Sequence, residues 1–163
     1  MSDEWYEKAT EVCKQCGGHC CKNAHPPLTE ERISILAEKQ VSSDNIEFAG
    51  YKRLKVKKDG MCVMFNENGM CAIQEFKPET CVAGPFTFDV KDGVIELYLK
   101  KESICPLVAV LKQDREAYDE QYKTAVEKII RVVAFLPEDE LWTVCGIEEP
   151  DTDKIEELNL TIE

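Results

Sequence analysis

Four cysteines near the start of the sequence lie within nine residues: Cys13, Cys16, Cys20 and Cys21. The spacing Cys-x2-Cys lets two sulfurs converge on one centre, and Gly17 and Gly18 let the backbone turn tightly around it. Thiolates this close together are typical of a metal ion or an iron–sulfur cluster. This segment therefore predicts a cofactor rather than a particular reaction.

Cys20 and Cys21 are adjacent, and this limits how they can bind metal. Neighbouring side chains of an extended backbone point to opposite sides. The pair is therefore better suited to two metals, or to two corners of a larger cluster, than to one tetrahedral ion. We expect two nearby centres or one extended cluster.

Further cysteines follow at positions where the backbone can direct amides towards sulfur. Cys62 and Cys71 each follow a Gly-Met pair, Cys81 follows a proline-initiated turn, and Cys105 precedes a proline at the start of a helix. Buried core cysteines are the alternative for Cys62 and Cys71. The predicted ligands are Cys13, Cys16, Cys20, Cys21, Cys62, Cys71, Cys81 and Cys105.

Three other residues could change this ligand set. His19 and His25 could each replace one sulfur, although solvated loop histidines are commoner. Cys145 lies outside every motif, and we expect it to be a small buried residue or the neighbour of a helix C-cap.

Composition limits the class of protein. The 163 residues are 44% hydrophobic and 32% charged, which suits one globular domain. A net charge of −12 argues against a nucleic-acid or anionic-membrane partner. The acidic start lacks the basic and apolar regions of a signal peptide, so we expect a cytoplasmic protein whose thiols stay reduced rather than forming disulfides.

Hydrophobic periodicity predicts the elements that position the cysteines. We expect helices over 3–14 and from Glu30 to about Gln40, with Thr29 as the cap of the second. The next segment, 51–73, alternates like a hairpin, with Cys62 and Cys71 on opposite arms and a turn at 66–69. Residues 78–81 form a rigid corner that carries Cys81.

The second half of the sequence has clearer boundaries. A hairpin over 86–99 turns at Asp92-Gly93, and helices cover 107–136 with a break near Asp114. We expect one buried stripe of Tyr118, Tyr122, Val126, Ile129, Ile130 and Val133. A short helix is predicted over 153–158. The fold class is α+β: one domain, 1–163, with a cysteine-rich region 13–105, a helical part 106–163, and short hairpins and helices around a cysteine-ligated centre.

The residues from Cys13 to Cys105 resemble the CxxCxxCC family, described as zinc- or iron-chelating and often as containing an iron–sulfur cluster. The resemblance is carried by the leading cysteine group, one residue longer than the family name, and by the segments Asp59-Gly60-Met61-Cys62, Gly69-Met70-Cys71-Ala72-Ile73 and Lys77-Pro78-Glu79-Thr80-Cys81. It implies metal binding.

Three functions remain open from the sequence. The first is a cytoplasmic protein with a 4Fe-4S or larger cluster, acting with a protein partner in electron transfer, cluster handling or metalloenzyme maturation. The second is a zinc-binding structural or interaction module. The third is an enzyme on the same scaffold, although no catalytic set or phosphate-binding loop is visible.

Overall fold

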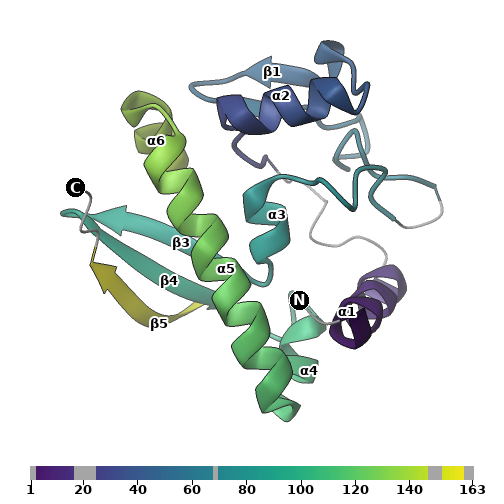
Figure 1. The fold of residues 1–163 in the computed structure, drawn as a ribbon, viewed down its shortest axis with the longest axis vertical. Coiled ribbons are helices and arrows are strands. Elements are labelled where there is room, and N and C mark those ends of the chain that lie inside the picture. Colours follow the sequence, from purple (N-terminus) through teal and green to yellow (C-terminus); the bar gives the residue numbers. More distant parts are fainter. Residues whose placement is uncertain (1–2, 17–24, 68–69, 147–151, 160–163) are drawn as a thin grey trace.

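The structure is a computed structural model that describes residues 3–16, 25–67, 70–146 and 152–159. The described part contains six α-helices and two small antiparallel sheets, which confirms the α+β class (Figure 1). The elements are α1 (Asp3–Cys16), α2 (Glu30–Glu38), β1 (Ile46–Phe48), β2 (Lys52–Leu54), α3 (Glu79–Ala83), β3 (Phe86–Lys91), β4 (Val94–Lys100), α4 (Leu107–Gln113), α5 (Arg115–Phe135), α6 (Glu138–Cys145) and β5 (Thr152–Asn159).

The larger sheet has the strand order β3-β4-β5. Its β3–β4 hairpin confirms the predicted one, because Asp92 and Gly93 take φ angles of 52° and 76° and close the tight turn. Ile95 and Leu97 are fully buried on the sheet face that α5 crosses. The sheet and α5 therefore enclose the first core.

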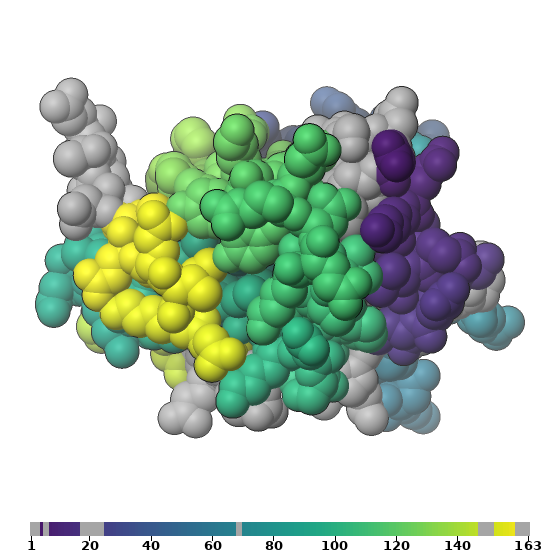
Figure 2. Space-filling view, turned by 90° about the horizontal axis from the view of Figure 1, so that it is seen from below, coloured from purple at the N-terminus to yellow at the C-terminus, as the bar shows by residue number. Residues whose placement is uncertain are grey.

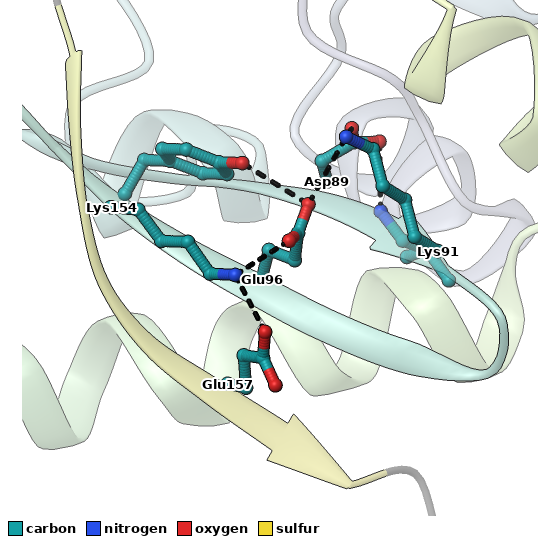
Figure 3. A network of polar contacts seen from close by, with 7 residues as sticks. Asp89, Lys91, Glu96, Lys154 and Glu157 are labelled. Atoms are coloured by element: carbon teal, nitrogen blue, oxygen red, sulfur yellow. Dashed lines mark hydrogen bonds and ion pairs between the residues drawn. The ribbon is translucent and has the colours of Figure 1, made fainter.

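The helix predicted over 153–158 is wrong, because this segment is the edge strand β5, which pairs along β4. The open edge of β4 offers backbone hydrogen bonds that outweigh the local helical preference of Lys154 to Leu158. An ion pair stabilises the pairing of β5 with β4, because Lys154 Nζ lies 2.8 Å from Glu96 Oε2; from the other side, Lys91 Nζ of β3 lies 3.5 Å from Glu96 Oε1 (Figure 3). The bond from Lys154 lowers the pKa of the Glu96 carboxyl.

The predicted helices over 107–136 are confirmed, including the break, where the Asp114 side chain accepts from Ala117 N and caps α5. The predicted stripe is only partly right. The buried residues of α5 are Ala117, Gln121, Ala125, Ile129, Val132 and Val133, whereas Ile130 is exposed. Tyr118 and Tyr122 are half-buried and pack edge-on against Phe86, at centroid distances of 5.6 and 6.0 Å.

A second core lies between α2 and the loops that follow β2. It contains Leu28, Leu36, Leu54, Cys62, Met64 and Ile73. The Thr29 hydroxyl accepts from Arg32 N at 3.1 Å, which confirms the predicted cap of α2. The regular hairpin predicted over 51–73 is wrong: β2 pairs with β1, and the described residues between 55 and 73 form turns with two isolated bridges, Val56–Cys62 and Phe65–Cys71.

The β1–β2 hairpin is attached to α6. Glu140 accepts from Lys52 N at 2.9 Å and from Lys52 Nζ at 3.0 Å. Gly50, at φ 83°, approaches Thr143 so closely that a Cβ would lie 2.7 Å from its Cγ2. On the opposite side of the molecule α1 lies against α4, with α5 and β5 following across the same face (Figure 2).

Candidate metal centre

Two predicted ligands lie on the last turns of α1. The predicted helix 3–14 is confirmed and extends to Cys16, so Cys13 and Cys16 share one helix face at i, i+3 spacing. Both residues line a small cavity of about 20 Å³ between α1 and the start of α4. The space is close to that of one water molecule.

Cys105 completes this cavity from a distant part of the sequence. Its own N–H donates to Lys101 O at 3.1 Å, and its carbonyl accepts from Val108 N at 3.1 Å, so the turn before α4 is fixed. The remaining lining is largely apolar: Val12, Ile104, Pro106 and Leu107. Three predicted thiol ligands therefore share one apolar cavity; we name Cys13, Cys16 and Cys105 the α1–α4 cysteines.

Cys62 and Cys71 lie in the second core. Cys62 is 7% exposed, and Cys71 packs at the edge of the same cluster. They lie on neighbouring turns, because Phe65 N donates to Cys62 O at 2.9 Å and Ala72 N donates to Met64 O at 2.6 Å. Asn66 N donates to Met70 O at 2.7 Å, which brings together the two ends of the predicted turn at 66–69; positions 68 and 69 themselves lie outside the described residues.

Cys81 lies on α3, between the two cores. The predicted proline-initiated turn is confirmed, since Pro78 caps the helix and its carbonyl accepts from Cys81 N at 3.0 Å. Gly84 ends the helix. Cys81 is half-buried on this corner.

The described cysteines are not placed close enough together to ligate one metal ion. Within 3–16, 25–67, 70–146 and 152–159, no three His, Cys, Asp or Glu side chains are close enough to hold one ion. Cys20, Cys21 and His19 lie outside the described residues. The α1–α4 cysteines nevertheless fit a metal in chemistry: they offer three soft sulfur donors, one short of a four-thiolate set, in apolar surroundings. The eight-cysteine ligand set stays a prediction.

His25 has an unusual imidazole. Its Nδ1 is buried without a hydrogen-bond partner in the described structure, while its carbonyl accepts from Tyr51 OH at 2.8 Å. Burial lowers the pKa of His25, with a further contribution from Arg53. A neutral imidazole with an unused nitrogen has the chemistry of a metal ligand, but among the described residues no group of three metal-ligating side chains includes it.

Cys145 differs from the predicted ligands. It is the last residue of α6, and Gly146 is the C-cap, which confirms its expected place beside a helix cap. It is half-buried, and burial raises the pKa of its thiol. A thiol that stays protonated is a poor ligand, so Cys145 provides a control position.

Sequence reasoning missed the buried polar side chains around Cys81. Arg32 binds Glu79 and the Phe76 carbonyl, and Gln121 binds the carbonyls of Val82 and Gly84. Gln121 could have been found, because it interrupts a buried i+4 series of Ala117, Ala125 and Ile129. Arg32 and Glu79 carry no periodic signal and become visible only in the fold.

Fold and site together define a small α+β domain whose described cysteines lie on loops, on the short helix α3 and at helix ends. A family model confirms the class: residues 12–124 match CxxCxxCC, described as "Putative zinc- or iron-chelating domain". The chain belongs to this family. No curated protein and no solved structure matches the chain. In the part of the chain that the structure describes, no helix is both long and apolar enough to cross a membrane.

Proposed function

We propose that this chain is a cytoplasmic iron–sulfur cluster-binding protein that acts in electron transfer, cluster handling or the maturation of another metalloenzyme. The eight cysteines predicted as ligands would hold the cluster or clusters. The observation that carries the proposal is the shared cavity of the α1–α4 cysteines, which unites two cysteines of the leading motif with Cys105. Packing alone does not require three thiols on one cavity.

The surroundings of these thiols favour a cluster. Val12, Ile104 and Leu107 form apolar walls, and both Cys13 and Cys105 pack against the first core. Solvent exposure is one of the factors that set the reduction potential of a cluster, and apolar walls limit it. A bound cluster would supply one-electron chemistry, while these residues would hold it and exclude solvent.

The proposed partner is a protein. Trp142 is 83% exposed and Phe48 67%, and aromatic side chains are enriched where proteins bind one another. Glu138 and Asp139 are exposed on the first turn of α6, so the surface near Trp142 favours a basic partner over a nucleic acid or an anionic membrane. The cytoplasmic assignment is supported by the need to keep these thiols reduced.

A zinc-binding structural or interaction module is the second candidate. It is favoured by the segment from Lys55 to Pro78, whose described residues form only turns and single bridges around Cys62 and Cys71. Loops with so little regular structure are typical of structural zinc sites, where the metal replaces part of a core.

Elemental analysis of protein purified without oxygen separates the candidates. We expect a brown protein with broad absorbance near the violet end of the visible spectrum, and with iron and acid-labile sulfide in similar amounts. Cys145→Ser serves as the matched control and should retain the full content. A colourless wild type with stoichiometric zinc would establish the zinc module instead, and iron without sulfide would indicate a mononuclear site.

A further inference from the structure

The corner that carries Cys81 is held from two sides by buried side chains of other helices. α3 has only five residues, too few to be a stable helix alone. It lies between α2 and α5 (Figure 1). The position of α3 therefore depends on its contacts with α2 and α5.

Arg32 holds the start of the corner from α2. Its Nε and Nη2 donate to Glu79 Oε1 at 2.9 and 2.7 Å, and its Nη1 donates to Phe76 O at 3.1 Å. The Glu79 side chain is 2% exposed and that of Arg32 is 11% exposed. The guanidinium thus fixes both the side chain two residues before Cys81 and the backbone that leads into the turn.

Gln121 holds the end of the corner from α5. Its Nε2 donates to Val82 O and to Gly84 O, both at 2.9 Å, and the residue is 4% exposed. These carbonyls belong to the residues one and three positions after Cys81. The backbone on each side of the cysteine is therefore bonded to a different helix.

Stability alone does not explain this arrangement. Burying a charged pair costs solvation that apolar residues of similar size would not lose, and Glu79 Oε2 remains buried without a hydrogen-bond partner in the described structure. In some proteins such buried polar groups serve to fix one geometry, as a single buried polar residue fixes the register of a coiled coil. Here the residue whose geometry is fixed is a predicted metal ligand.

We propose that Arg32, Glu79 and Gln121 are positioning residues that fix the thiol of Cys81 for metal binding. This inference rests on the proposed function, because it takes Cys81 as a ligand. Arg32 and Glu79 would align the turn from the side of the second core, and Gln121 from the side of the first. None of these three side chains needs to touch the metal itself.

The test compares Glu79→Gln with Glu140→Gln in the metal-loaded protein as purified without oxygen. Both changes remove the charge of a buried carboxylate that binds a cationic side chain, but Glu140 binds Lys52 and lies on α6, which carries no predicted ligand. Gln121→Met, which removes both carbonyl contacts, is the second variant. N-ethylmaleimide labelling, quantified for each cysteine by mass spectrometry, reports the protection of each thiol.

We expect the metal to protect Cys81 in the wild type. Glu79→Gln and Gln121→Met should each lower the metal affinity by about 10- to 100-fold, the usual effect of removing a group that orients a ligand, and should raise the labelling rate of Cys81 as its bound fraction falls. Glu140→Gln should leave that rate unchanged. The ligand-to-metal absorbance per bound metal should fall in Glu79→Gln and stay constant in Glu140→Gln, a change that general destabilisation would not produce.

Each other outcome has a distinct meaning. Equal protection of Cys81 in all variants would overturn the positioning role and leave the proposed function intact. If the metal protected Cys13 and Cys16 but not Cys81 in the wild type, Cys81 would not be a ligand and the inference would fall. A wild type that holds no metal would refute the proposed function itself.

Discussion

Removal of the metal should loosen the second core before the first. The second core depends on residues 28–76, whose later part has little regular structure, whereas the first contains a three-stranded sheet and the 21-residue helix α5. Metal bound to the native state stabilises it by the difference between native and unfolded affinity. Structural zinc contributes on the order of 10 kcal/mol to small peptides, comparable to the whole stability of a domain.

Hydrogen exchange measures this loss of stability as an increase in the exchange rates of backbone amides. If the metal contributes even about 4 kcal/mol to the second core, its removal should accelerate exchange there by roughly a thousandfold. Suitable reporters are the amides of Val63, which donates to Lys55 O at 3.0 Å, and Ala72, which donates to Met64 O at 2.6 Å. Amides of Ile129 and Val132 inside α5 serve as the matched control.

The experiment records exchange in holo protein and in protein treated with a chelator under the same conditions. We expect large acceleration at Val63 and Ala72 and changes of less than about tenfold at Ile129 and Val132. Unchanged protection at Val63 and Ala72 would show that the second core forms without metal. A reactive-thiol or disulfide role would then explain them better.

Three further predictions address the ligands and the sheet. Cys20→Ser or Cys21→Ser should lower metal content measured by elemental analysis, whereas Cys145→Ser should not; equal content in all three would mean that the doublet is misassigned. Phe86→Leu should cost about 1–3 kcal/mol in urea unfolding, because two edge-on ring contacts worth about 0.5–1.5 kcal/mol each are lost. The hydroxyl of Tyr122 donates to the carboxylate of Glu156 on β5, and this hydrogen bond raises the pKa of Tyr122 to about 12. This folded-state pKa lies above the ordinary value of about 10, so the hydrogen bond should stabilise the fold below pH 10 and lose its effect between about pH 10 and 12. In urea unfolding, Tyr122→Phe should make the free energy of unfolding less dependent on pH in that range.

Local chemistry explains which parts of the fold were predictable. Thr29 and Asp114 cap their helices through their own side chains, and Asp92-Gly93 closes its hairpin through backbone angles that favour these residue types. Each of these signals is complete within a few residues. The elements that they delimit were therefore predicted correctly.

Features that depend on distant partners could not be predicted in this way. β5 is a strand because β4 leaves an open edge, and β2 pairs with β1 rather than with the segment that follows it. Cys105 reaches Cys13 and Cys16 only because α4 packs against α1. The sequence thus indicated the candidate ligands, and tertiary packing decides which of them lie together.

X-ray absorption at the iron and zinc edges of protein purified without oxygen is the most direct measurement of the central claim, that these cysteines hold an iron–sulfur cluster. We predict a strong iron edge, a first coordination shell of sulfur, and a short iron–iron vector beyond it. A zinc edge alone, with sulfur at about 2.3 Å, would contradict the cluster and support the zinc module. An oxygen or nitrogen shell around either metal would contradict binding by the cysteines.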